Sequence, residues 1–175
     1  MIFILSLGKP IQKIDYSKNQ DIEDFTIAEQ SPSGTSLVLG SYNRLHVFNW
    51  SQSKQIWEEA QSKTIENFYT VSSLAWKPDG SRLVAGNMTG AVELFDCCLK
   101  RSRYKGKFEF NYVSPSQVIV KRLSTGSRIV LKSHYGYEIQ KINIFQDQFL
   151  TAITAETLLI GDLSSCKLSE VIGQS

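Results

Sequence analysis

The stretch from Ser72 to Cys98 reads SSLAWKPDGSRLVAGNMTGAVELFDCC, and it decides the fold. It contains three short apolar runs that are separated by two turn signals, residues 77–80 and 86–90. Pro78 presets the backbone of the first turn and Gly80 accepts a positive φ, so Pro-Asp-Gly is a turn with a physical cause. The aliphatic and aromatic residues between the turns suit a pleated surface. The stretch therefore predicts a three-stranded meander, which cannot bury both of its faces by itself.

The same unit occurs upstream with matching turn positions. Gly34 precedes Gly80 by 46 residues, and Gly40 precedes Gly86 by the same number. A period near 40–45 residues with several strands in each copy is typical of β-propeller blades. Phe95-Asp96 stands where a complete WD40 repeat would carry Trp-Asp. We therefore expect an all-β fold, a WD40-type β-propeller. The tryptophans are expected in the core between blades: Trp50, Trp57 and Trp76.

The length of 175 residues limits how much of a propeller the chain holds. Propellers have about four to eight blades of four strands, so a closed ring would be tight. We expect residues 1–175 to form a single partial section of about four blades, an open fragment or a piece of a longer protein. The expected blades are 22–60, 68–109, 110–133 and 137–173. Tyr104–Phe108 is expected as the outer strand of the second blade.

Two segments allow alternatives to the strand prediction. Residues 1–16 contain two apolar runs, Ile2–Leu7 and Ile11–Ile14, which we interpret as outer strands of a blade whose start is missing. A signal sequence is the alternative, but the basic n-region is absent. Trp57–Ala60 is either a strand or a helical turn, and we predict a strand because no 3.6-residue apolar stripe extends beyond it. No apolar run reaches transmembrane length.

The composition favours no particular class of ligand. The net charge of +2 requires neither a nucleic acid nor an anionic membrane as a partner. Three cysteines, Cys97, Cys98 and Cys166, are an odd count without a framework spacing, which indicates free thiols in a reducing compartment. His46 and His134 lack the close spacing of zinc ligands. We expect no metal and no cofactor.

Catalytic groups are equally hard to find. Gly86–Gly90 superficially resembles part of a phosphate loop, but it lacks the Gly-Lys-Ser/Thr end and precedes a strand, so we interpret it as a turn. Glu58-Glu59 and the acidic group of Asp21, Glu23 and Asp24 are candidate carboxylates. Neighbours on a strand alternate faces, and acidic loops are usually solvated. An enzyme with an unrecognised site therefore has no positive support, and we expect no small-molecule substrate.

One run of basic residues within eight positions is the candidate interaction surface: Lys100, Arg101, Arg103, Lys105 and Lys107. Such a cluster binds acidic partners or anionic headgroups in many proteins. The structural interpretation is a solvated outer strand and loop, where lysines discourage edge pairing. Tyr104 and Phe108 interleave with the basic residues as in nucleic-acid stacking, but the near-neutral chain argues against that ligand.

Six stretches together are similar to one known family. They are LGSYNRLHVFNW (39–50), LAWKPDGSRL (74–83), FDCCL (95–99), PSQVIVK (115–121), VLKSHYGYE (130–138) and ETLLIGDL (156–163). The chain resembles the N-terminal WD40 region of the intraflagellar transport protein 172 family, over roughly Ile11 to Glu170. The FDCCL and KSHYGYE segments carry most of the specificity, since they are not general WD40 features.

The resemblance implies a large non-enzymatic scaffold, with propellers followed by a helical-repeat solenoid. Members of this family belong to intraflagellar transport complex B, which carries cargo along ciliary microtubules and supports cilium assembly. The implied partners are other subunits of this complex, with membrane or cargo contacts in addition. The implied locations are the cilium or flagellum, the basal body and the cytoplasm. The alternative is a coat-like or membrane-trafficking propeller that binds anionic lipid headgroups through Lys100–Lys107.

Overall fold

The computed structural model describes residues 2–6, 9–17, 24–60 and 62–173. These residues form strands β1 to β18, and no helix occurs among them, which confirms the all-β prediction. The chain divides into two compact units. The first contains Met1–Pro78 and Arg82–Phe95, and the second contains Asp79–Ser81 and Asp96–Ser175. Sequence analysis expected a single section without such a division.

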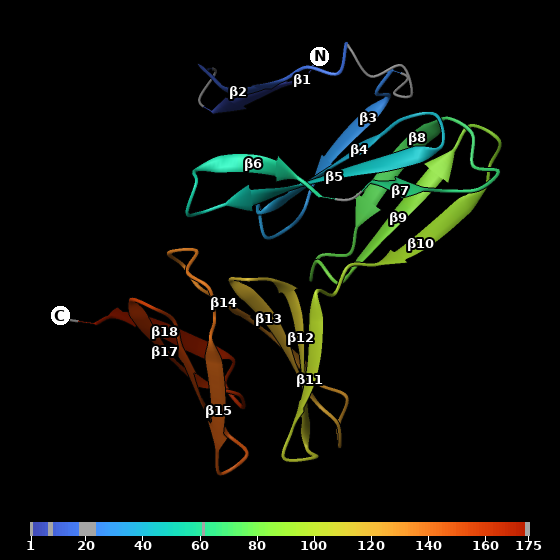
Figure 1. Ribbon diagram of the computed structural model, residues 1–175. Coiled ribbons are helices and arrows are strands. Elements are labelled where there is room, and N and C mark those ends of the chain that lie inside the picture. The colour runs from blue at the N-terminus through green and yellow to red at the C-terminus, as the bar shows by residue number, and fades with distance from the viewer. Residues whose placement is uncertain (1, 7–8, 18–23, 61, 174–175) are drawn as a thin grey trace. The chain divides into compact units, whose positions relative to one another are not determined.

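The first unit contains three antiparallel sheets (Figure 1). The first sheet pairs β1 (Ile2–Ser6) with β2 (Lys9–Ile14). The second has the order β3 (Ile27–Gln30), β4 (Ser36–Gly40), β5 (Arg44–Ser51) and β6 (Ile56–Glu59), and the short β7 (Lys63–Thr64) also pairs with β5. The third contains β8 (Val71–Trp76), β9 (Arg82–Asn87) and β10 (Val92–Asp96). The segment at Trp57 is thus strand β6, as predicted.

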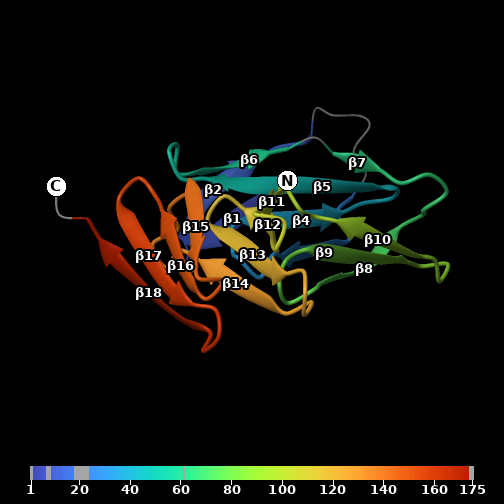
Figure 2. The ribbon, with the colours of Figure 1, turned by 90° about the horizontal axis from the view of Figure 1, so that it is seen from below.

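The second unit contains two four-stranded meanders, each in simple chain order. The first runs through β11 (Lys100–Tyr104), β12 (Phe108–Ser114), β13 (Gln117–Arg122) and β14 (Arg128–Lys132). The second runs through β15 (Lys141–Phe145), β16 (Phe149–Ile153), β17 (Thr157–Asp162) and β18 (Lys167–Ile172). Figure 2 shows β18 as the outermost red strand of its sheet.

The expected boundary between blades 68–109 and 110–133 is wrong. Residues 104–108 do not form an outer strand; instead β11 pairs with β12, from Lys100 opposite Tyr112 to Tyr104 opposite Phe108. The cause is the turn between them, where Lys105 and Gly106 have φ values of 49° and 66°. Positive φ at both central residues is the geometry of a tight hairpin. Strand β11 therefore belongs to the β11–β14 sheet, and the β8–β10 sheet has three strands.

The other two expected blade ranges contain the main strands of two sheets, although β7, which pairs with β5, lies outside 22–60. Strands β3–β6 lie within 22–60 and β15–β18 lie within 137–173. Leu7 and residues 22–23 lie outside the described residues. Of the three tryptophans, Trp57 is buried, whereas Trp50 and Trp76 are half-buried. The predicted core position is thus confirmed for Trp57, and Trp50 and Trp76 are only partly buried.

The glycines of the repeated unit serve two different purposes. Gly34 and Gly80 occupy matching turns and have φ values of 77° and 74°, which side chains with a Cβ adopt only with strain. Gly40 lies within β4, and a Cβ there would lie 2.7 Å from Cγ1 of Val71 and 2.8 Å from Cγ2 of Ile27. Gly40 is therefore required by a close approach between strands rather than by a turn.

Val71, at the start of β8, is the point where the β8–β10 sheet contacts the β3–β6 sheet. Its side chain is completely buried. Its backbone N–H donates to the carbonyl of Ser41 at 3.0 Å, and its carbonyl accepts a hydrogen bond from the hydroxyl of Thr26. Side-chain packing and backbone hydrogen bonding thus meet at one residue, so the two sheets are held at a defined separation.

The opposite face of the β3–β6 sheet packs against the β1–β2 hairpin. Leu39, Phe48 and Trp57 form a buried cluster, and residues of the hairpin lie against it: Ile2, Ile4, Ile14 and Tyr16. The side-chain amide of Gln12 accepts from the backbone N–H of Trp57 and donates to its carbonyl, both at 2.7 Å. Gln12 thereby takes the place of a strand partner at the outer edge of β6.

A single buried cluster joins the two sheets of the second unit. It takes alternate residues from β12, β13, β15 and β16, as half-buried strands require, and one residue each from β14 and β17. Its members are Phe108, Phe110, Val118, Val120, Leu131, Ile139, Ile142, Ile144, Leu150, Ala152 and Leu159. Each such side chain contributes about 1.5–3 kcal/mol relative to exposure, so this unit has a substantial core of its own.

The two kinds of glycine give the first prediction. Gly40→Ala should lower the free energy of unfolding by about 1–3 kcal/mol, because the new methyl group collides with Val71 and Ile27. Gly34→Asn should change it by less than about 1 kcal/mol, because Asn tolerates positive φ and the site is open. Urea unfolding of the chain measures both. Equal losses for the two variants would contradict the distinction.

Candidate interaction surfaces

The five predicted basic residues are all exposed, but they lie on different sides of one hairpin. Lys100, Arg101 and Arg103 belong to β11, whereas Lys105 and Lys107 lie in the turn to β12. Alternation along a strand places Arg101 and Arg103 on one face of the sheet and Lys100 on the other. The five residues therefore do not form one continuous basic patch.

Acidic neighbours offset part of this positive charge. Arg101 forms an ion pair with Asp96, and Lys107 forms one with Asp147. Arg103 lies directly opposite Glu109 on β12. The two ion pairs are exposed and contribute little to stability, but they reduce the field that an anionic surface would meet.

The remaining two ammonium groups lie over aromatic rings. Nζ of Lys100 is 5.6 Å from the ring centroid of Tyr112, and Nζ of Lys105 is 5.2 Å from that of Tyr104. Such cation–π contacts orient a lysine without neutralising its charge. Lys100 and Lys105, together with Arg103, are therefore the residues of this strand best placed to meet an acidic partner.

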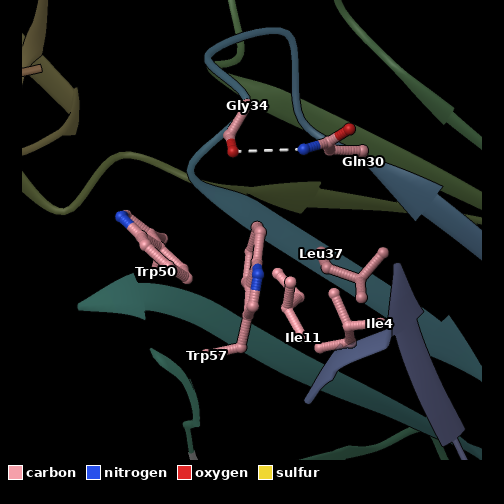
Figure 3. Close-up of a pocket in the computed structure, with 7 residues that line it drawn as sticks. All are labelled: Ile4, Ile11, Gln30, Gly34, Leu37, Trp50 and Trp57. Atoms are coloured by element: carbon pink, nitrogen blue, oxygen red, sulfur yellow. Dashed lines mark hydrogen bonds between the residues drawn. The ribbon is translucent and has the colours of Figure 1, made fainter. Parts of the chain in front are cut away.

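A groove of about 400 Å³ opens in the first unit, beside the β1–β2 hairpin (Figure 3). Its lining residues are Ile4, Ile11, Gln30, Gly34, Leu37, Trp50 and Trp57. Trp50 and Trp57 are cross-strand partners whose ring centroids lie 5.7 Å apart. The amide of Gln30 donates to the carbonyl of Gly34 at 3.1 Å, so this polar group already serves the β3–β4 turn. The lining contains no ionisable side chain, and the groove therefore suits apolar contact rather than catalysis.

A chain of polar contacts that begins at the buried His46 lies on the same face of the β3–β6 sheet. Nδ1 of His46, which is 1% exposed, lies 3.0 Å from one carboxylate oxygen of Glu59. The other oxygen of Glu59 accepts from the hydroxyl of Tyr16 at 2.5 Å. Burial, followed by the hydrogen bond to Glu59, raises the pKa of Tyr16. The arrangement ties the segment after β2 to β5 and β6, so we interpret it as structural.

No metal site accompanies this histidine. Within residues 2–6, 9–17, 24–60 and 62–173, no group of three or more His, Cys, Asp and Glu side chains could hold a metal ion. Among the described residues, Cys97, Cys98 and Cys166 form no disulfide bond. Nor does any helix among the described residues have the length and apolar character needed to cross a membrane.

Among the residues that the structure describes, the candidate carboxylates form no catalytic pair. Glu58 is exposed and forms an ion pair with Lys54 at 2.6 Å. Asp24 is exposed as well. Asp21 and Glu23 lie outside the described residues.

The glycine-rich segment 86–90 is the turn between β9 and β10, as interpreted from the sequence. The side-chain oxygen of Asn87 accepts from the backbone N–H groups of Thr89 at 3.1 Å and Ala91 at 2.8 Å. A phosphate loop needs such N–H groups free for its ligand. Here they are already used inside the turn, so this segment does not act as a phosphate loop.

The β15–β18 sheet presents an apolar surface that sequence analysis did not anticipate. One set of alternate residues is buried in the core of the second unit. Apolar residues of the opposite set are 39 to 55% exposed. They form the outer apolar face, which consists of Phe145, Phe149, Ile153, Leu158, Ile160 and Val171.

The pairing register divides the outer apolar face into two groups, between which Ile160 lies opposite the polar Thr151 and Ser169. Phe145 lies opposite Phe149, Ile153 lies opposite Leu158, and Leu158 in turn lies opposite Val171. Groups of exposed apolar side chains on one face of a sheet are candidate contact sites in soluble proteins. The sequence shows the apolar residues on both faces of β17, which is typical of a strand buried on both sides, but it does not show which face lacks a cover.

Glu170 connects the end of β14 to β17 and β18 within the second unit. Its carboxylate accepts from the hydroxyl groups of Ser133 at 2.8 Å and Thr157 at 2.6 Å, and from the backbone N–H of His134 at 2.6 Å. Burial raises the pKa of Glu170, but the hydrogen bonds from Thr157, Ser133 and the backbone outweigh it, so the pKa is lowered overall. This carboxylate is a structural anchor for the KSHYG segment.

Residues 37–154 match the protein family described as the anaphase-promoting complex subunit 4 WD40 domain. The chain belongs to this WD40 domain family. The prediction of a WD40-type fold is thus confirmed, and the antiparallel sheets of this WD40 chain are consistent with a partial propeller.

Individual relatives of the WD40 chain are intraflagellar transport proteins. It is 58% identical to the mouse intraflagellar transport protein 172 homolog over 168 residues, and 56% identical to intraflagellar transport protein 172 of Chlamydomonas reinhardtii over 164 residues. The intraflagellar transport protein osm-1 of Caenorhabditis elegans is 35% identical over 165 residues. These matches confirm the resemblance to the intraflagellar transport protein 172 family.

The matches cover nearly the whole WD40 chain but little of its relatives. They include 95% of this chain and 10% of the mouse protein, and 94% of this chain and 9% of the Chlamydomonas protein. The chain therefore spans about a tenth of the length of these relatives. The matched family is described as a WD40 domain and the mouse relative as a transport protein, in agreement with the expectation of a non-enzymatic protein.

Glu170 gives a prediction about pH. Its folded-state pKa lies below the ordinary value of 4.5, so the carboxylate adds stability above that pH, and the addition is lost as the pH falls through the folded-state pKa. Glu170→Gln should cost about 1.5–3 kcal/mol at neutral pH, because a carboxylate with several donors is lost. The acid limb of the stability curve should also become shallower. Urea unfolding between pH 3 and 7 measures both effects, with the exposed Glu138→Gln as the control.

The outer apolar face gives a prediction about association. The isolated 175-residue chain should self-associate, and Ile160→Lys should shift it towards the monomer, because a charge at the centre of the face opposes burial. Leu123→Lys, in the β13–β14 turn, adds the same charge away from the face and should leave association unchanged. Sedimentation velocity over a range of concentrations measures this. A wild-type chain that stays monomeric throughout would contradict the prediction.

Proposed function

We propose that this chain is a non-catalytic, protein-binding section of an intraflagellar transport scaffold, which supports cargo movement along ciliary microtubules and cilium assembly. The observation that carries the proposal is the identity of 56 to 58% with intraflagellar transport protein 172 homologues from mouse, zebrafish and Chlamydomonas. This chain covers only about a tenth of each relative. Its contribution to the proposed scaffold is therefore local: surfaces on rigid sheets to which partners bind.

The surfaces of the chain support a binding role. Rigid sheets that present loops and side chains without clustered catalytic groups recognise partners by shape and charge. The outer apolar face offers apolar contact area, and the exposed Lys100, Arg103 and Lys105 offer positive charge. The proposed partners are other subunits of intraflagellar transport complex B, with cargo or membrane contacts in addition. The proposed locations are the cilium or flagellum, the basal body and the cytoplasm.

Lipid binding through Lys100–Lys107 is not favoured by the geometry. A planar membrane would need the cationic groups on one side, whereas they are distributed over two faces and a turn. Two of the five already form ion pairs, with Asp96 and Asp147. Protein contact uses the same residues without requiring them to be coplanar.

The test uses the full-length protein, tagged and expressed in ciliated cells. The variant Lys100→Glu/Arg103→Glu/Lys105→Glu should reduce recovery of transport subunits in pull-downs several-fold. The matched control, Lys54→Glu/Lys63→Glu/Lys77→Glu, changes the same charge at exposed positions elsewhere and should leave recovery unchanged.

Two outcomes would contradict the proposal. Absence of the wild-type protein from cilia, together with no transport subunits in its pull-downs, would remove the transport role. Equal recovery of transport subunits with both triple variants would show that Lys100, Arg103 and Lys105 do not form the contact. Flotation with phosphatidylserine vesicles tests the lipid alternative, which requires binding that depends on Lys100, Arg103 and Lys105.

A further inference from the structure

The loop between β14 and β15 displays aromatic side chains that lie outside the core of the second unit. It contains most of the KSHYGYE segment, residues 132–138, which is not a general WD40 feature. His134 is exposed, Tyr135 is 46% exposed, and Tyr137 is half-buried. The buried core cluster of the unit consists of other side chains. Packing of the core therefore does not account for these three aromatic residues.

Hydrogen bonds fix the shape of this loop. Ser133 is 1% exposed, and its backbone N–H donates to the carbonyl of Ser116 at 2.9 Å. Its hydroxyl donates to the carboxylate of Glu170 at 2.8 Å and accepts from the backbone N–H of Tyr137 at 3.2 Å. Gly136, with a φ of 76°, donates its N–H to the carbonyl of Ser133 at 3.3 Å. A loop that is ordered beforehand loses little conformational entropy when a partner binds.

The three aromatic rings of the loop form a row. The ring centroids of His134 and Tyr135 lie 5.3 Å apart, and those of Tyr135 and Tyr137 lie 6.3 Å apart. Tyrosine rings offer a large contact area at a low cost in conformational entropy. The face of a tyrosine ring also attracts cations, because it carries the negative part of the quadrupole. The row is therefore suited to a flat, positively charged group.

Two carboxylates accompany this row. Glu138 is the last residue of the segment, and Glu156 lies in the turn between β16 and β17. Glu170 joins this turn to the loop, because the hydroxyls of Thr157 and Ser133 donate to the same oxygen of its carboxylate. Glu138 and Glu156 are exposed, and neither forms an ion pair within the part of the chain that the structure describes. Both charges are thus available to a partner.

We propose that His134, Tyr135 and Tyr137 bind an arginine side chain that a partner protein displays. A guanidinium group is planar, stacks on aromatic faces and donates paired hydrogen bonds to carboxylates. Lys132 contributes a positive charge at the end of β14, but the two carboxylates outnumber it. They would repel an anionic headgroup or an acidic segment. This partner differs in charge from an acidic partner of β11, and the contact does not depend on the proposed transport role.

Fluorescence anisotropy with the full-length protein tests the arginine site. The probe is the labelled peptide GRGRGRGRGR, and its uncharged counterpart carries citrulline in place of each arginine. The wild-type protein should bind the arginine peptide about tenfold more tightly than the citrulline peptide. Tyr135→Ala/Tyr137→Ala should remove most of this preference, whereas Tyr135→Phe/Tyr137→Phe, which keeps both rings, should retain it. The matched control is Tyr42→Ala/Tyr69→Ala, which removes another pair of exposed tyrosines, with ring centroids 6.0 Å apart, and should also retain it.

The carboxylates are tested in the same assay. Glu138→Gln/Glu156→Gln should weaken binding of the arginine peptide several-fold and leave the citrulline peptide unaffected. Glu66→Gln/Glu93→Gln removes two exposed carboxylates of the first unit and should change neither.

Three results would overturn the proposal. The first is an arginine preference that survives Tyr135→Ala/Tyr137→Ala unchanged. The second is equally tight binding of the lysine peptide GKGKGKGKGK, which would show that charge alone is recognised. The third is tighter binding of the acidic peptide GEGEGEGEGE. None of these measurements requires cilia or transport subunits, so they are independent of the functional test.

Discussion

A small antiparallel sheet becomes stable when other sheets cover its faces, and this constraint organises the whole chain. The β3–β6 sheet satisfies it on both sides. Val38 and Leu45 are buried on one face, and Leu39 and Phe48 are buried on the other. The β15–β18 sheet satisfies it on one side, and its outer apolar face is exposed. The chain thus contains one sheet that is covered on both faces and one that is covered on a single face.

Two specific contacts set the spacing between sheets. In the first unit, the absence of a side chain at Gly40 allows Val71 to approach β4, and backbone hydrogen bonds hold it there. In the second unit, the carboxylate of Glu170 binds donors from both sheets and so joins β14 to β17 and β18. One contact works by shape and the other by charge-assisted hydrogen bonds. Neither contact involves the residues that first suggested an interaction surface.

Much of the fold could be predicted because turn chemistry is local. The repeated glycines at 34 and 80 have the positive φ that their turns require, and most strands follow the apolar runs between turns. The error at residues 104–108 arose because apolar Tyr104 and Phe108 suggested a strand, whereas Lys105-Gly106 forms a tight turn. The half-buried state of Trp76 could not be predicted, since it depends on what lies against the β8–β10 sheet.

The candidate surfaces were less predictable because they depend on contacts between distant segments. The basic run was visible, but the ion pair of Lys107 with Asp147 joins residues 40 positions apart. The groove beside Trp50 and Trp57 is assembled from strands β1 to β6. The outer apolar face was invisible for a related reason: a strand that is apolar on both sides does not reveal which side is covered within a given segment. The family assignment came from rare sequence segments and not from any of these surfaces.

The account depends on the claim that uncovered faces of these sheets are covered in the complete protein. Hydrogen–deuterium exchange of residues 141–172, measured in the full-length protein and in the 175-residue chain, tests it most directly. Covering the outer apolar face suppresses local opening of the strands beneath it, so the account predicts slower exchange in the full-length protein for β15 to β18. Equal exchange rates in the two forms would show that this face stays uncovered and would contradict the account.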